Sequence, residues 1–401
     1  MSLLLIDELA SNDILIRWRD YPRCFPRTIV HRRLLRTPLH RLSILWPPPP
    51  LFLYCPTRNQ AVSLFPSATF HFAGIQFPPG IQVFAPFPPL NQTANHYFPY
   101  QGGESFFRDV LTSMETVYLN RNPTAKSILE LVHSVDNEQI CYDHLAFRTF
   151  GINGYGINSM ASFFLDYGYT QKEELRFPAK KLRALWFSPP SSSSQDGGSG
   201  VNGPLPRVFI SELLVDQMSP KTQEIIRKYT EKSGSGNKYA ALASAMGSLT
   251  WEKPLYSEFQ QLAGESEYAA WTLVNGYALN HVTISAHRLK SNLRSIKSLN
   301  QFIEKSGFKL NSEGGVLKVS PDGLLLQSST VADSIPFCFS DGINETVPCS
   351  YIEFAERLVL PQYKNLPERE VKESHRRDGF EVGNADKIFE STSKEQLTRR
   401  A

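Results

Sequence analysis

A weak internal repeat constrains the fold of this 401-residue chain more than any other feature of its sequence. The runs "YDHLAFRTF" and "YALNHVTIS" both read as strands that carry a histidine, His144 and His281. Each run is followed by a helical pattern, a glycine turn and further strands, and a glutamate lies in the last of these strands, Glu212 or Glu353. This order predicts an α+β fold in which two βαβββ halves form one curved central sheet around a metal site, with added helices.

Three side chains of these strands are candidate metal ligands. In such a sheet the first and last strands of each half lie at the middle, so His144, His281 and Glu353 reach one interior. Two imidazoles and one carboxylate form the facial triad of non-haem iron(II) enzymes. A buried glutamate needs a cationic partner, either a metal ion or an arginine such as Arg148 or Arg357. The pattern therefore predicts a metal site at the two histidines and the second glutamate.

Glu212 has two interpretations. It follows His144 by 68 residues, much as Glu353 follows His281 by 72, so it occupies the matching position of the first half. As a fourth ligand it would favour a redox-silent zinc or manganese site, typical of a lyase or isomerase. As a remnant of the duplication it would be a structural residue held by hydrogen bonds.

The first 103 residues differ in composition from the rest of the chain. They hold nine arginines, no lysine and 15 of the 28 prolines, and their four acidic residues all precede Tyr21. No apolar run approaches the roughly 20 residues of a membrane span. An arginine-rich, acid-poor segment is typical of organelle transit regions. We therefore predict a disordered N-terminal transit region that directs import into a plastid (chloroplast or amyloplast), with the mitochondrion as the alternative.

Residues 104–401 are expected to form the catalytic domain. We place its first half at about 138–216, a helical insertion at about 217–272, its second half at about 273–360 and a C-terminal segment at 361–401. Basic and acidic residues number 33 and 35 after residue 103, and no basic stripe of the kind that binds nucleic acid is visible. The five cysteines form no CxxC pair, which favours a reduced compartment. We expect no nucleic-acid or membrane partner.

The runs "YDHLAFRTF", "NHVTIS" and "YIEFAER", in this order and spacing, resemble the 2-oxoadipate dioxygenase/decarboxylase family, also called hydroxyglutarate synthases. The resemblance covers roughly residues 104–401. It implies a fold related to the vicinal-oxygen-chelate superfamily and an Fe(2+) cofactor. The family's metal ligands fall on His144, His281 and Glu353, and its substrate-binding arginine falls on Arg148.

The resemblance extends to a C-terminal segment that lines the family's pocket. Its counterpart is the run "FEVGNADKIFES", which suggests Val382 and Gly383 as further substrate-binding residues. The implied reaction converts 2-oxoadipate and O2 to 2-hydroxyglutarate and CO2, in lysine catabolism. Arg148 suits the distal carboxylate, because a guanidinium binds a carboxylate bidentately and stays charged.

Two other functions fit the same scaffold. One is a metal-dependent lyase or isomerase, which would differ in its metal and would work without oxygen. The other is a non-catalytic organelle protein that binds a metabolite. A degraded triad would favour this last function, and all three triad positions are intact.

Overall fold

The chain divides into two units, residues 1–89 and 90–401. The structure, a computed structural model, describes residues 5–8, 14–17, 101–136, 139–152, 154–190, 198–233 and 236–398. In the first unit it describes one antiparallel pair of strands, β1 (Leu5–Glu8) and β2 (Ile14–Arg17). Apart from these strands and the start of helix α1 (Gln101–Arg121), the predicted transit region lies outside the described residues.

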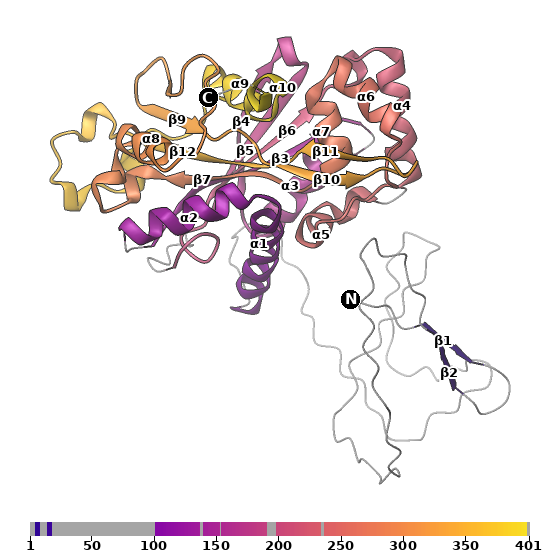
Figure 1. Cartoon of the computed structure of the whole chain (residues 1–401). Coiled ribbons are helices and arrows are strands. Elements are labelled where there is room, and N and C mark those ends of the chain that lie inside the picture. Colours follow the sequence, from indigo (N-terminus) through magenta and orange to yellow (C-terminus); the bar gives the residue numbers. More distant parts are fainter. Residues whose placement is uncertain are drawn as a thin grey trace, which may run out of the picture. The chain divides into compact units, whose positions relative to one another are not determined.

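An eight-stranded, curled sheet forms the centre of the second unit (Figure 1). Its strand order is β4-β5-β6-β3-β7-β12-β9-β8. The first half supplies β3 (Tyr142–Phe150), β4 (Thr170–Phe177), β5 (Leu182–Ser188) and β6 (Arg207–Leu213), and the second supplies β7 (Leu279–Ser285), β8 (Lys318–Val319), β9 (Leu325–Ser329) and β12 (Tyr351–Arg357). With helices α3 (Ile157–Asp166) and α8 (Ile296–Lys305), this confirms the predicted pair of βαβββ halves.

The halves meet where β3 and β7 pair in antiparallel fashion. Strand β6 runs parallel to β3, and β12 runs parallel to β7. The first and last strands of each half thus occupy the four central positions, as the repeat predicts. Every residue of β3 and β7 is buried, whereas the edge strand β4 is mostly exposed.

Alternating side chains give the sheet an apolar outer face and a polar inner face. Helices α1, α2 (Pro123–Asp136), α3 and α8 contact the sheet on the outer face, where Phe147 of β3 meets Phe164 of α3. Helices α7 (Glu267–Asn275) and α9 (Val382–Ile388) cover the inner face. The polar residues of the central strands are therefore enclosed between the sheet and these two helices.

The remaining elements surround this core. Helices α4 (Pro220–Lys232), α5 (Ala240–Met246) and α6 (Tyr256–Glu265) precede α7, the hairpin β10 (Ser334–Cys338) and β11 (Asn344–Pro348) lies outside the main sheet, and α10 (Lys394–Thr398) follows α9. None of the described helices is both long and apolar enough to span a membrane. The described cysteines, Cys141, Cys338 and Cys349, are free thiols.

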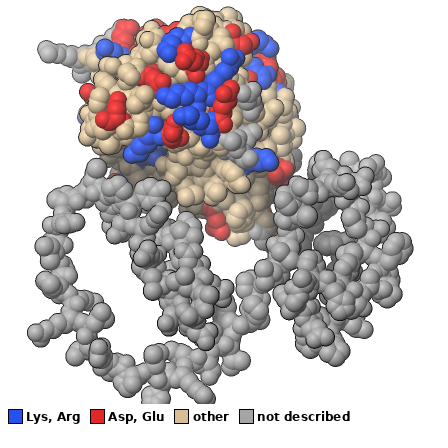
Figure 2. Space-filling view, turned by 90° about the vertical axis from the view of Figure 1, so that its right-hand side faces the viewer, with Lys and Arg blue, Asp and Glu red and all other residues tan. Residues whose placement is uncertain are grey.

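Charges of both signs are interspersed on the face seen in Figure 2. Helix α4, on that side of the molecule in Figure 1, carries three lysines that each pair with a glutamate: Lys221–Glu224, Lys228–Glu258 and Lys232–Glu252. These pairs offset the charges of the three lysines.

Candidate metal centre

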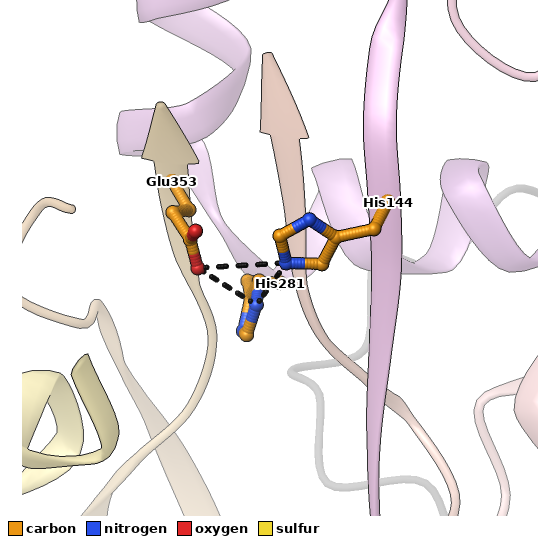
Figure 3. Close-up of side chains that lie close together, drawn as sticks. All are labelled: His144, His281 and Glu353. Carbon is orange, nitrogen blue, oxygen red and sulfur yellow. Dashed lines mark hydrogen bonds and ion pairs between the residues drawn. The ribbon is translucent and has the colours of Figure 1, made fainter. Parts of the chain in front are cut away.

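Three buried side chains from neighbouring strands converge on the inner face of the sheet (Figure 3). His281 Nε2 lies 3.1 Å from Glu353 Oε2 and 3.3 Å from His144 Nε2. The distance from His144 Nε2 to Glu353 Oε2 is 3.6 Å. The structure thus brings together the three residues that the repeat singles out as ligands.

Strand register explains why these side chains meet. His144 of β3 pairs with Thr283 of β7, which in turn pairs with Glu353 of β12. His281 pairs with Ala146, one pleat along the same face. Adjacent strands lie about 4.8 Å apart, so side chains that share a face in neighbouring rows can bring their polar atoms together.

The residue before each histidine orients its ring. His144 Nδ1 donates a hydrogen bond to Asp143 Oδ1 at 2.8 Å, and His281 Nδ1 donates to Asn280 Oδ1 at 3.0 Å. Because Nδ1 carries the proton, Nε2 of each ring presents its lone pair to the centre of the triad. Sequence reasoning missed both partners, although the dipeptides "DH" and "NH" were a visible signal.

Protonation states favour a cation at this position. Burial raises the pKa of Glu353, but the two histidines outweigh it and lower that pKa to about 2. Burial lowers the pKa of His281 to about 4. Burial also lowers the pKa of His144, yet Glu353 and Asp143 together raise it above its usual value. At neutral pH a divalent cation would therefore meet the Glu353 carboxylate and, at His281, a neutral imidazole.

The donor set fits a transition metal. Donor atoms about 2.1 Å from a metal lie roughly 3.0 Å apart at right angles and roughly 3.4 Å apart at tetrahedral angles. The three observed separations, 3.1, 3.3 and 3.6 Å, agree with such an arrangement. All three donors come from the sheet, which leaves the opposite side of the centre for other ligands.

Arg148 is a buried cation on the same face of β3. Its guanidinium lies 5.0–5.6 Å from the ring centres of Tyr268, Trp271 and Phe389. It donates hydrogen bonds to Thr392 Oγ1 at 3.0 Å and to the Phe389 carbonyl at 3.2 Å. Among the described residues no carboxylate lies within ion-pair distance of it. The carboxylate of Glu390 acts on this charge only from beyond ion-pair distance. A buried charge without an ion-pair partner is costly, which points to an anionic ligand.

Comparison with known proteins identifies the family. The family model for 2-oxoadipate dioxygenase/decarboxylase matches residues 110–372. The chain belongs to this family. Two curated relatives support the assignment: the chloroplastic enzyme of Arabidopsis thaliana is 78% identical over 297 residues (74% of this chain, 80% of the relative), and the chloroplastic/amyloplastic enzyme of Oryza sativa is 71% identical over 301 residues (75% and 82%).

Solved structures agree with the family assignment. The crystal structure of the Oryza sativa hydroxyglutarate synthase in complex with 2-oxoadipate is 68% identical and covers 79% of this chain and 100% of its own, with a TM-score of 0.74. A putative hydrolase from Shewanella frigidimarina is 30% identical and covers 69% and 98%, with a TM-score of 0.56. These comparisons confirm the predicted family, fold and enzyme class, and the relatives' names agree with the predicted plastid.

In this dioxygenase/decarboxylase chain, Glu212 is not the counterpart of Glu353. The prediction that the two glutamates occupy equivalent positions was wrong. Glu353 lies two residues beyond the partner of His281 on the adjacent parallel strand. The residue two beyond the partner of His144 is Phe209. The spacing of 68 residues therefore overshoots the equivalent position by three, because loop lengths differ between the halves.

Glu212 has a structural role instead. Its Oε2 accepts a hydrogen bond of 2.8 Å from the backbone N–H of Ile157, the first residue of α3, and its Oε1 accepts one of 2.5 Å from Arg183 Nε. It is not part of the metal-ligand cluster found among the described residues. The carboxylate thus caps a helix, which matches the structural interpretation rather than a fourth ligand.

Gln327 of β9 holds the metal-facing carboxylate in place. Its side-chain amide donates a hydrogen bond of 2.7 Å to Glu353 Oε1, the oxygen that faces away from the histidines. Its own carbonyl accepts one of 3.0 Å from Asn384 of α9. Because the first of these hydrogen bonds occupies Glu353 Oε1, the other oxygen, Oε2, faces the position of the metal. Sequence reasoning missed Gln327, because nothing local indicates that β9 pairs with β12.

Replacing Gln327 by leucine is expected to weaken metal binding by about 10- to 100-fold, the usual effect of removing an outer partner of a ligand. Competition with a chromophoric chelator would measure the affinity for iron(II). The matched control is Ser328→Ala, because Ser328 is equally buried but bonds to Asn300 on the outer face. An unchanged affinity in the leucine variant would show that Glu353 needs no such support.

The C-terminal segment covers the triad. A cavity of about 20 Å³ remains beside the ligands and is lined from this segment by Phe380, Ala385, Ile388 and Phe389. About one water molecule fills such a volume, so a larger ligand enters only when these side chains move. Val382 is 39% exposed and borders a separate surface hollow, and Gly383 does not line the cavity. Their substrate-binding roles remain predictions.

Proposed function

We propose that this chain is an iron(II) dioxygenase/decarboxylase that converts 2-oxoadipate and O2 to 2-hydroxyglutarate and CO2 in plastid lysine catabolism. Residues 104–401 would be the catalytic domain and residues 1–103 the transit region. The observation that carries the proposal is the His–His–Glu cluster on the same face as a buried arginine that forms no ion pair among the described residues. The relative from Oryza sativa with 2-oxoadipate bound supports it.

The site offers a matching group for each end of a 2-oxo dicarboxylate. His144, His281 and Glu353 would hold the iron from one side, and Arg148 would bind the distal carboxylate. The chemistry supplied by bound iron(II) is the reaction of a chelated 2-oxo acid with O2, with loss of CO2 and hydroxylation of the remaining chain.

The protein's own residues orient the reactants and exclude water. Asp143 and Asn280 keep both Nε2 lone pairs on the metal side. Phe380 packs edge-on against His144, with ring centres 4.8 Å apart, and lines the cavity together with its neighbours in the C-terminal segment. A dry site strengthens each electrostatic contact with the substrate.

Oxygen uptake by the protein supplied with iron(II) and 2-oxoadipate tests the proposed function. We expect oxygen to fall in step with the appearance of 2-hydroxyglutarate. Turnover of a substrate with zinc or manganese and without oxygen would support the lyase or isomerase instead. Binding of 2-oxo acids without turnover would support the metabolite-binding alternative.

Replacing Arg148 by leucine is expected to lower kcat/KM for 2-oxoadipate by about 100-fold or more, because a buried charge pair with the distal carboxylate is lost. Steady-state kinetics would measure this. The control substrate is 2-oxohexanoate, which has a methyl group in place of the distal carboxylate, and the variant should lose far less with it. A loss of equal size with both substrates would contradict the assigned role.

A further inference from the structure

Of the eight buried side-chain polar atoms that lack a hydrogen-bond partner of good geometry among the described residues, two lie on the inner face of the sheet on residues that line the triad cavity or share a strand with His144. They are the hydroxyl of Tyr351 and the Nε–H of Arg148, on side chains that are 1% and 2% exposed. An unpaired buried polar group destabilises a protein, so such groups are rare. Two of them on one inner face of the sheet call for an explanation.

The ring of Tyr351 is fixed beside the metal centre. It stacks on the imidazole of His281, with ring centres 4.6 Å apart and planes inclined by 25°. The residue pairs with His281 in the sheet, lies two positions before Glu353 and lines the triad cavity. The stack needs only the ring, so a phenylalanine would serve it equally well. The hydroxyl therefore has a separate purpose.

The Tyr351 hydroxyl lies within the electrostatic reach of Arg148. Burial raises the pKa of the phenol above its usual value, and the charge and close approach of the Arg148 side chain oppose that rise. Tyr351 lines the triad cavity, Arg148 lines a second hollow of about 220 Å³, and Phe389 borders both. The distal part of a substrate would lie where the two meet.

We propose that Tyr351 is a substrate-binding residue that donates a hydrogen bond to the distal carboxylate of the 2-oxo dicarboxylate. Nη1 and Nη2 of Arg148 already bond to Thr392 and Phe389, so Nε is the guanidinium nitrogen that has no partner and is free for the substrate. A carboxylate has two oxygens, so one accepts from Nε–H and the other from the phenol. A single anion then satisfies both unpaired atoms. This inference rests on the proposed function.

The same contact sets the length of the substrate. The tyrosine ring is rigid and rests on a triad residue, so the distance between the metal centre and the hydroxyl is constant. A 2-oxo acid with its second carboxylate at that distance gains the bond. Shorter or longer homologues, and acids with no second carboxylate, do not.

Replacing Tyr351 by phenylalanine tests the proposal, because the stacked ring is kept. We expect kcat/KM for 2-oxoadipate to fall by about 10- to 100-fold, mainly through KM, since a hydrogen bond to a charged group is lost. With 2-oxohexanoate the variant and the wild type should be equal. The affinity for iron(II) should not change. Tyr277→Phe is the matched control, because it removes a buried hydroxyl that bonds to the Tyr155 carbonyl, away from the triad.

Two outcomes would overturn the proposal: equal losses with both substrates, or no loss with 2-oxoadipate. If the wild type turns over neither substrate, the proposed function fails, and anaerobic calorimetry of 2-oxoadipate binding to the iron(II)-loaded proteins decides the role of Tyr351. Weaker binding to the Tyr351→Phe protein by the same 10- to 100-fold then supports it, and equal binding overturns it.

Discussion

The His281→Ala variant is expected to lose iron(II) affinity by more than 100-fold and to show no oxygen uptake with 2-oxoadipate. His281 Nε2 is the donor atom closest to both other ligands, at 3.1 and 3.3 Å. Its removal leaves one imidazole and one carboxylate, too few donors to hold the ion in a fixed position. Removing a direct ligand should lower the metal affinity by more than the roughly 10- to 100-fold that follows the loss of a residue bonded to a ligand. Chelator competition and an oxygen electrode would measure both quantities.

His287→Ala provides the matched control for this experiment. His287 is also buried, at 7% exposure, but its ring contacts Glu373 and Ser285 outside the triad. The control variant should bind iron(II) like the wild type even where its stability is lower. If both variants lose the metal equally, the loss reflects general destabilisation and the triad assignment is wrong.

The free energy of unfolding of the Arg357→Met variant is expected to be about 3–5 kcal/mol lower than that of the wild type. This is the usual effect of removing one partner of a buried ion pair. Arg357 is 0% exposed and binds Asp143 through two hydrogen bonds, of 2.6 and 2.9 Å. It also donates to the carbonyls of Arg377 and Gly379, which lead into the C-terminal segment. Urea unfolding of the metal-free protein, followed by tryptophan fluorescence, would measure the change.

Arg176→Met is the control for the stability measurement. Arg176 also pairs with a carboxylate, that of Glu174, but its side chain is 64% exposed, so solvent screens the pair. We expect its replacement to change stability by less than about 1 kcal/mol. Similar losses in the two variants would contradict the role given to Arg357. Iron(II) affinity should also fall in the Arg357→Met variant alone, because Asp143 orients His144.

Much of the fold and of the site could be predicted from the sequence. The internal repeat predicted that the first strand of each half carries a histidine. Because side chains alternate between the two faces of a strand, the sequence also predicted that Arg148 lies on the same face as His144. Both inferences depend on residues that are neighbours along the chain. The strand order and the convergence of His144, His281 and Glu353 agree with them.

Only the tertiary structure decided which strands are neighbours and in what register. Counting along the chain matched Glu212 to Glu353, whereas strand pairing places Phe209 there and turns Glu212 into a helix cap. The roles of Gln327 and Tyr351 likewise depend on contacts between strands that are far apart in sequence. Local sequence determines which face of a strand a side chain occupies, because the pleat has a period of two. Its partner across the sheet depends on loop lengths and long-range packing, and no local pattern records these.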